Sequence, residues 1–316
     1  MARKDVNIVT SLVGKGLERE ALLLRELLAT HDVYTNFYHY CNYAGSNFVR
    51  ADINLFLEVM MPNVLTLSRE NWLFPNDEWW NSLNDQFLPR ITKVCCKTQD
   101  SFRHWCQKVD PAKCVYVGFE ARDLYHPEIP RENKFLHLAG GSEFKNTEAV
   151  IQAWKNGNWA YKPFPLTVVT LQKKWQALCE DVDNVTWIPR VNEDELVQLM
   201  NSHRFYLMPS AYEGFGHAIH EGLGCGALVL TTDAPPMNEF DGIVTEWKIP
   251  VVSQTPRSLA QLNQVSLIGV QAAVCKAIET TSHPNELERR SCAAREAFLN
   301  ARKIFRQKFL SMVGVA

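Results

Sequence analysis

The sequence predicts an α/β protein made of two doubly wound parallel-sheet domains. Short apolar runs alternate with helical patterns in both halves of the chain, and a glycine turn follows the first apolar run of each half. Such alternation is typical of crossover units whose strands run parallel in one sheet. The 316 residues also exceed the ~150 residues typical of a single domain, so the length favours two hydrophobic cores.

The first half begins with an apolar run over residues 7–12, a Gly14-Lys15-Gly16 turn and a leucine-rich helical pattern. Further strands are expected at 33–38, 53–59, 64–68, 92–98 and 113–119. The charged, proline-containing stretch 118–131 interrupts both patterns and is expected to link the domains. The first predicted domain accordingly spans residues 1–126.

The second half repeats this order with a strand at 135–139, a glycine turn and a helix at 147–154. Later strands are expected at 166–171, 185–188, 204–209 and 227–232. The second predicted domain spans 127–284, and a terminal helix begins at Asn285, which forms a capping-box signal with Glu288. The apolar face of this helix repeats at helical spacing through Leu287, Ser291, Ala294, Phe298, Ala301, Phe305 and Phe309.

Charge and cysteine content exclude several classes of protein. The 33 Lys and Arg against 35 Asp and Glu give a net charge of −2, which supplies no field for a nucleic acid or an anionic membrane. The nine cysteines contain no Cys-x-x-Cys pair, so reduced thiols in an intracellular compartment are the simpler interpretation. We find neither a secretory signal nor a long apolar run, and we expect a cytoplasmic protein without a transmembrane segment.

The most informative segment is residues 209–221, which connect a predicted strand to a helix. Gly214 and Gly216 allow backbone amides to approach a ligand, and a helix that begins near His217 directs its free N–H groups toward an anion such as a diphosphate. Glu221 follows Gly216 by five residues, about 7 Å along a helix, where it can accept hydrogen bonds from a ribose diol. Glu213 is then placed to face a sugar.

Glu213 and Glu221 are separated by seven residues that include a glycine-aromatic-glycine loop. In this the chain resembles the retaining family-4-like glycosyltransferases, which have the GT-B architecture of two Rossmann-like domains facing each other across a cleft. The resemblance extends over most of the second half, from Gly140 to Glu239. It implies an enzyme, a hexosyltransferase that moves a hexose from a nucleotide diphosphate sugar to a glycan acceptor. It also implies that residues 285–316 pack back on the first domain.

The resemblance also assigns roles to individual residues. Lys145 matches the lysine that neutralises the departing diphosphate, so Lys145 and Glu213 are the expected catalytic residues. The family places an arginine a few residues before this lysine, whereas here Ser142 and Arg190 are the candidates to replace it. The remaining donor-binding candidates are Gly14, Lys15, Gly16, Gly141, Ile188, Gly214, Phe215, Gly216, His217 and Glu221.

Acceptor recognition is expected in the first half. Glu70, Asn71 and Thr98 are expected to follow predicted strands, and the carboxyl ends of parallel strands are where such sheets bind ligands. The aromatic-rich loop that includes Trp79 and Trp80 forms either a packed cluster or an acceptor or partner surface. Asp181 and Asp183 imitate a metal-binding acidic pair, but they lie in a polar turn, and we expect no metal site and no cofactor requirement.

The sequence leaves more than one donor and more than one activity possible. Family frequencies slightly favour GDP-mannose over UDP-glucose as the donor. The expected partners are this nucleotide-sugar and a glycan acceptor, no nucleic acid is expected, and a homodimer is compatible with the sequence. A nucleotide-sugar epimerase, or a catalytically silent sugar-nucleotide binding protein that lacks the family arginine, is also consistent with the pattern.

Overall fold

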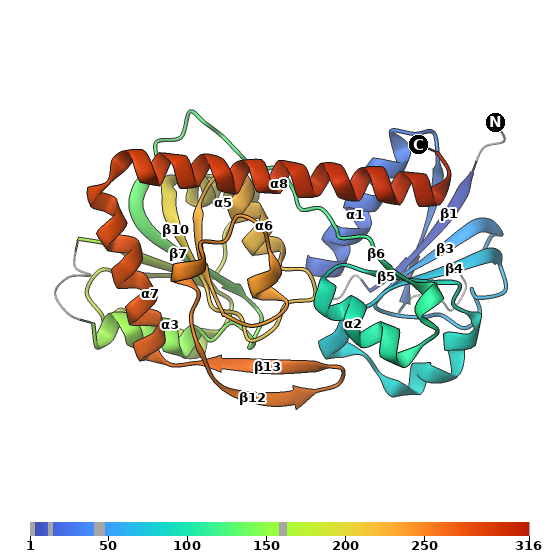
Figure 1. The fold of residues 1–316 in the computed structure, drawn as a ribbon, viewed down its shortest axis with the longest axis horizontal. Coiled ribbons are helices and arrows are strands. Elements are labelled where there is room, and N and C mark those ends of the chain that lie inside the picture. Colours follow the sequence, from blue (N-terminus) through green and yellow to red (C-terminus); the bar gives the residue numbers. More distant parts are fainter. Residues whose placement is uncertain (1–3, 12–14, 41–47, 158–162, 316) are drawn as a thin grey trace. The chain divides into compact units, whose positions relative to one another are not determined.

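The computed structural model describes residues 4–11, 15–40, 48–157 and 163–315 (Figure 1). The chain divides into two compact units. Unit 1 combines residues 1–120 with 257–260 and 301–316, and unit 2 combines residues 121–256 with 261–300. The first boundary falls after residue 120, within the stretch expected to link the domains, and two later segments return to unit 1.

Unit 1 contains a six-stranded sheet in which every neighbouring pair of strands is parallel. The order is β2-β1-β3-β4-β5-β6, with β1 at Asp5–Thr10, β2 at Tyr34–His39, β3 at Ala51–Leu57, β4 at Ser68–Phe74, β5 at Lys93–Cys96 and β6 at Cys114–Tyr116. The helices are α1 (Lys15–Ala29), α2 (Gln99–Lys108) and the 3-10 helices η2 (Asp77–Trp79), η3 (Ser82–Arg90) and η4 (Pro111–Lys113). Because β1 lies between β2 and β3, the strand order reverses there, and ligands of such sheets bind beyond the carboxyl ends at this point.

One expected strand of unit 1 is wrong. Residues 64–67 form turns, and the strand β4 begins at Ser68. Val64 and Leu65 are buried in the hydrophobic core of unit 1, and side-chain amides from the sheet satisfy their carbonyls: Asn54 Nδ2 donates to Val64 O at 2.8 Å and Asn71 Nδ2 to Leu65 O at 3.1 Å. The short apolar run at 64–68 therefore indicates that these side chains are buried, and it does not indicate strand pairing.

Unit 2 contains a five-stranded sheet, also parallel throughout, in the order β11-β10-β7-β8-β9. The strands are β7 (Glu132–Gly140), β8 (Leu166–Thr170), β9 (Val185–Ile188), β10 (His203–Met208) and β11 (Leu228–Thr231). The helices are α3 (Thr147–Lys155), α4 (Gln176–Glu180), α5 (Glu193–Ser202), α6 (His217–Gly224) and α7 (Leu267–Glu279), with 3-10 helices η6 (Lys173–Trp175), η7 (Met237–Glu239), η8 (Thr245–Trp247) and η9 (Thr280–Ser282). The predicted fold class, two Rossmann-like parallel-sheet domains, is confirmed.

Sequence patterns missed the hairpin formed by β12 (Val251–Arg257) and β13 (Ala260–Val265), and they missed α7. The hairpin escaped because β12 is polar, contains Pro256 and is exposed along most of its length. Such a strand lacks the alternation of buried and exposed side chains that identifies a half-buried strand.

The terminal helix α8 (Pro284–Val313) keeps its predicted apolar face, along which Leu287, Ala294, Phe298, Phe305 and Phe309 are buried. The predicted cap is wrong, because the helix begins at Pro284, a residue favoured at the first helical position, and Asn285 lies inside the first turn. The aromatic rings of Phe309 and Trp72, both in unit 1, meet edge to face with centroids 6.3 Å apart. Across the described residues, no helix is both long and apolar enough to cross a membrane.

Candidate functional site

The loop between β10 and α6 in unit 2 is shaped for an anion. Gly216 has φ of +83°, and a Cβ atom there would lie 3.2 Å from Phe240 Cε2, so both its conformation and its surroundings favour glycine. Helix α6 begins at the next residue, His217. The first amides of α6 have no partner within the helix itself, which makes its amino end suited to a phosphate group.

The start of α3 holds this loop in place. Asn146 adopts the left-handed conformation at the helix cap, and its Nδ2 donates to Pro209 O at 2.7 Å and to Asn263 O at 3.0 Å. Ala211 N donates to Phe144 O at 2.8 Å. These hydrogen bonds connect the turn after β7 to the turn after β10, two strands that pair in the sheet.

Lys145 and Glu213, the two expected catalytic residues, meet in this region. The Lys145 Nζ forms an ion pair and a hydrogen bond with Glu213 Oε1, and Ser210 Oγ donates to the same oxygen at 2.5 Å. Their side chains are only 15% and 11% exposed. An ammonium has three N–H donors, so a lysine paired in this way retains the capacity to bind phosphate oxygens.

Glu221 has an arginine partner that sequence patterns missed. Its side chain is 2% exposed, and its Oε1 accepts a hydrogen bond from Arg122 Nε at 2.8 Å. Arg122 Nη1 also donates to Glu193 Oε2 at 2.6 Å, while its Nη2 is buried and has no hydrogen-bond partner among the described residues. Arg122 precedes Glu221 by 99 positions and lies in the linking stretch, where no local pattern marks it as a partner.

His220 supports the loop from one turn inside α6. Its ring stacks on Phe215 with centroids 4.2 Å apart and an interplanar angle of 10°. Its Nδ1 lies 3.1 Å from Gly216 O, and because a carbonyl only accepts, Nδ1 is the donor. Burial lowers the pKa of His220 to about 4, so the ring is neutral at pH 7. The sequence motif contains His220 but did not indicate this supporting role.

The other donor candidates in unit 2 lie at different distances from the sheet centre. Gly141 and Ser142 follow β7, the middle strand, and Ser142 Oγ accepts a hydrogen bond from Phe144 N at 3.1 Å. Ile188 ends β9, one of the two edge strands, and Arg190 is exposed two residues later. The structure therefore brings Gly141 and Ser142 close in the fold to Lys145, and it leaves Ile188 and Arg190 on the sheet edge.

The first glycine turn is only partly described. Gly14 lies outside the described residues, Lys15 begins α1, and Gly16 lies in the first turn of that helix. A Cβ atom on Gly16 would meet nothing within 4 Å. Lys15 and Gly16 belong to unit 1.

The expected acceptor residues have mainly structural contacts. Glu70 and Asn71 lie inside β4, so the expectation that they follow a strand is wrong. Glu70 pairs with Lys93, and Asn71 is buried among hydrogen bonds to neighbouring segments. Thr98 does follow a strand, and it caps α2 by accepting a hydrogen bond from Ser101 N at 3.1 Å.

A different set of side chains occupies the carboxyl ends of these strands. Glu58 follows β3, Asn76 and Glu78 follow β4, and Lys97 follows β5. Glu20 joins them from α1 through an ion pair of 2.7 Å with Lys97. We call these five residues the unit 1 polar cluster. Sequence patterns missed Asn76 and Glu78 because the end of β4 was misplaced.

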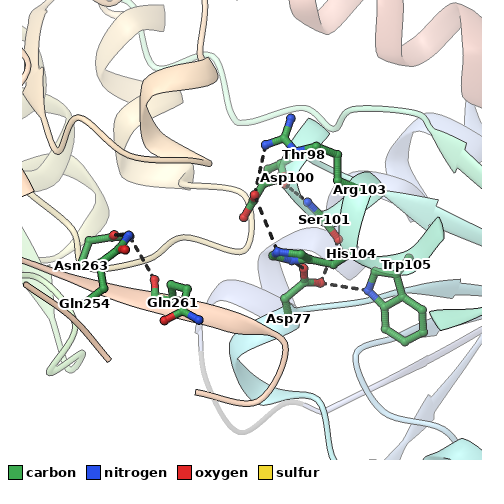
Figure 2. Close-up of polar contacts among 10 residues, drawn as sticks. All are labelled: Asp77, Thr98, Asp100, Ser101, Arg103, His104, Trp105, Gln254, Gln261 and Asn263. Atoms are coloured by element: carbon green, nitrogen blue, oxygen red, sulfur yellow. Dashed lines mark hydrogen bonds and ion pairs between the residues drawn. The ribbon is translucent and has the colours of Figure 1, made fainter. Parts of the chain in front are cut away.

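A second polar group in unit 1 centres on Asp77 (Figure 2). Asp77 Oδ2 accepts from His104 Nδ1 at 2.8 Å, and Asp77 Oδ1 accepts from Ser101 Oγ and Trp105 Nε1, each at 2.9 Å. The hydrogen bond with Asp77 raises the pKa of His104. Since Asp77 is buried and its oxygens have these partners, it orients α2 around the end of β4.

Figure 2 also shows polar contacts among residues of the β12–β13 hairpin that belong to unit 2: Gln254 Nε2 donates to Asn263 Oδ1 at 2.7 Å and Asn263 Nδ2 donates to Gln261 O at 3.0 Å. In the described part of the chain, no group of three or more His, Cys, Asp or Glu side chains is arranged to hold a metal ion. Asp181, considered above for metal binding, forms an ion pair with Lys155.

Comparisons with known proteins bear on the fold of the chain. Residues 125–240 match the family model described as glycosyl transferases group 1. A comparison with curated proteins found no match. Among solved structures, sucrose-phosphate synthase from Thermosynechococcus elongatus matches with a TM-score of 0.72 at 11% identity, covering 98% of both chains. A glycosyltransferase from Rickettsia africae ESF-5 matches with a TM-score of 0.65 at 14% identity, covering 99% of this chain and 98% of the other.

A third structure, the pneumococcal O-GlcNAc transferase GtfA in complex with UDP and GlcNAc, matches with a TM-score of 0.60 at 14% identity. The match covers 83% of this chain and 57% of GtfA, so this chain spans little more than half the length of GtfA. At these identities the similarities establish the fold.

Proposed function

The chain carries a glycosyl transferases group 1 domain on a GT-B fold, and from this premise we propose that it is a retaining hexosyltransferase. It moves a hexose from a nucleotide diphosphate sugar to a glycan acceptor. The observation that carries the proposal is the Lys145–Glu213 pair, held by Ser210 in the loop that precedes the amino end of α6.

The chemistry requires stabilisation of a departing diphosphate. Cleavage of the sugar–phosphate bond moves negative charge onto the leaving oxygen, and a preorganised cation with helix-end amides stabilises that charge by several kcal/mol in a water-poor site. Lys145 and the amides at Gly216 and His217 supply these groups. The low exposure of the Lys145 and Glu213 side chains strengthens the electrostatic contribution.

The remaining residues position the donor. Glu213 binds hydroxyl groups of the hexose, and Glu221 binds the ribose while Arg122 holds its carboxylate in place. Retention follows if the acceptor hydroxyl attacks from the face of the leaving group and a phosphate oxygen accepts its proton. We propose GDP-mannose ahead of UDP-glucose as the donor, on family frequencies alone.

Calorimetric titration of the purified chain with GDP-mannose and UDP-glucose tests donor binding, and release of nucleoside diphosphate with and without a glycan tests transfer. We expect saturable binding of one donor, acceptor-dependent release and a product with the donor's anomeric configuration by NMR. Absence of binding to any nucleotide-sugar contradicts the proposal, as does an inverted product.

One observation favours a second function. Residues 140–144 contain no arginine, so the diphosphate has less positive charge beside it than the family pattern provides. A catalytically silent sugar-nucleotide binding protein would bind donor tightly and release no nucleoside diphosphate with any glycan. Conversion of the donor to its epimer without an acceptor would instead indicate the epimerase alternative.

A further inference from the structure

We propose that the unit 1 polar cluster is the acceptor-binding site, and that it selects an uncharged, hydroxyl-bearing sugar over a phosphorylated or otherwise anionic one. The assignment of an acceptor to this site rests on the proposed function. The preference for uncharged groups stands on the cluster itself.

The position of the cluster is the first argument. Glu58, Asn76, Glu78 and Lys97 follow three adjacent strands of a parallel sheet, at the carboxyl ends where ligands of such sheets bind, and Glu20 joins them from α1. Glu58 has φ of +64°, an unfavourable backbone conformation for a side chain with a Cβ, directly after β3. The conformation turns the chain at the strand end and places a carboxylate there.

A chain of short hydrogen bonds orders the polar groups. Lys97 Nζ donates to Glu20 Oε1 at 2.7 Å and to Asn76 Oδ1 at 2.6 Å. Asn76 Nδ2 in turn donates to Glu58 Oε2 at 2.6 Å. The single positive charge of the cluster is therefore engaged by Glu20, and within the described part of the chain Glu58 and Glu78 form no ion pair.

Glu78 provides the second, independent observation. It is 8% exposed, and one of its oxygens accepts a hydrogen bond from its own backbone N–H. Its Oε2 is buried and has no hydrogen-bond partner among the described residues. Leaving such an atom unpaired costs about 1–3 kcal/mol, so a ligand group that pairs with it recovers that energy.

The electrostatics of the site determine which group pairs with Glu78. Burial raises the pKa of Glu78 to about 8 and also raises the pKa of Glu58. The charged groups that face Glu78 are Lys97, Asp77 and Glu58, and Glu20 faces Glu58. Near pH 7 most Glu78 carboxyls are consequently protonated, and each presents an O–H donor.

A sugar hydroxyl fits this combination because it both accepts and donates a hydrogen bond. It can accept from the Glu78 carboxyl and donate to the Glu58 carboxylate. A phosphate or carboxylate only accepts, and it would meet the Glu20 and Glu58 carboxylates, while the one ammonium, on Lys97, is already paired with Glu20. Like charges brought together in this way disfavour binding and provide selectivity.

Saturation-transfer NMR on the full chain, without donor, measures this selectivity directly. The probes are methyl α-glucoside, glucose 6-phosphate and glucosamine at pH 7. We expect saturable binding of methyl α-glucoside and at least ~10-fold weaker binding of glucose 6-phosphate, equal to 1.4 kcal/mol. Equal or tighter binding of the phosphate overturns the proposal. So does binding of glucosamine more than ~10-fold tighter, which would indicate a cation site.

Variants locate the site. Glu78→Ala should weaken methyl α-glucoside binding by about 10-fold, whereas Glu26→Ala, an exposed glutamate on α1 of the same unit, should not change it. Glu78→Gln keeps a donor and an acceptor, so it should bind as the unmodified chain does at pH 7 and stay unchanged up to pH 9. The unmodified chain should lose affinity as the pH rises through about 8. A circular dichroism spectrum confirms that each variant is folded.

Two further outcomes decide between sites. Loss of sugar binding in Glu213→Ala but not in Glu78→Ala would place the sugar in unit 2 and overturn the proposal. If donor binding fails while the selectivity among the three probes holds, the proposed function fails and the site assignment survives as a sugar site. If the donor binds but the three probes show no such selectivity, only the acceptor site is refuted.

Discussion

Lys145 and Glu213 form an ion pair across 68 positions of sequence, joining the turn after β7 to the loop before α6. The sequence marks Glu213 beside a glycine-aromatic-glycine motif, and the family resemblance marks Lys145 after a glycine turn. Their contact makes the cation and the carboxylate parts of one site.

Replacement of Lys145 tests the leaving-group contribution. Lys145→Ala should lower kcat for nucleoside diphosphate release by about 100-fold or more, because the developing charge loses its cation. Lys174→Ala is a matched control, since Lys174 is an exposed lysine of unit 2 that pairs with Glu143. Unchanged turnover in Lys145→Ala would show that Lys145 does not contact the leaving group.

The Arg122–Glu221 pair predicts an effect on stability. Arg122→Met should reduce the free energy of unfolding by about 1–3 kcal/mol, because it leaves a buried carboxylate with one fewer donor. Glu221→Gln introduced together with Arg122→Met should restore part of this loss, as a double-mutant cycle measures. Arg289→Met, on the exposed face of α8, should have no comparable effect on urea unfolding. Additive losses in the cycle would contradict the coupling.

Gly216 predicts a local effect on the loop. Gly216→Ala should destabilise the chain by about 1–2 kcal/mol, because alanine is unfavourable at φ of +83°. It should also weaken donor binding in calorimetry, since the new methyl group lies against Phe240. Gly269→Ala in α7 is the control, as a Cβ there meets only ordinary contacts. Donor affinity equal in both variants would exclude close approach of the ligand to Gly216.

His220 predicts a pH dependence with a definite sign. Its folded pKa of about 4 lies below the ordinary value of 6.5, so the unfolded chain binds more protons between these values. The contribution of His220 to stability is therefore complete above pH 6.5 and is lost as the pH falls toward 4. His220→Asn should reduce the difference in unfolding free energy between pH 7 and pH 5, whereas His283→Asn, a change at an exposed histidine, should leave it unchanged. An identical pH dependence in both variants would contradict the assignment.

Most of the strands were predictable because burial on both faces of a parallel sheet leaves continuous apolar runs. The runs at 135–139 and 227–232 correspond to β7 and β11. The run at 64–68 is misleading because a buried turn is as apolar as a buried strand. The strand therefore begins later than expected, and the expected acceptor residues Glu70 and Asn71 lie inside β4. β12 was missed because its exposure leaves no apolar pattern to read.

The sequence by itself determined the local features of the donor loop: the spacing of Glu213 and Glu221, the glycine at Gly216 and the helix that follows. These depend on backbone geometry over two or three turns. Only the tertiary structure decided that Glu213 meets Lys145 and that Glu221 meets Arg122, partners 68 and 99 positions away. Those pairings depend on how strands and helices pack, which no local periodicity encodes.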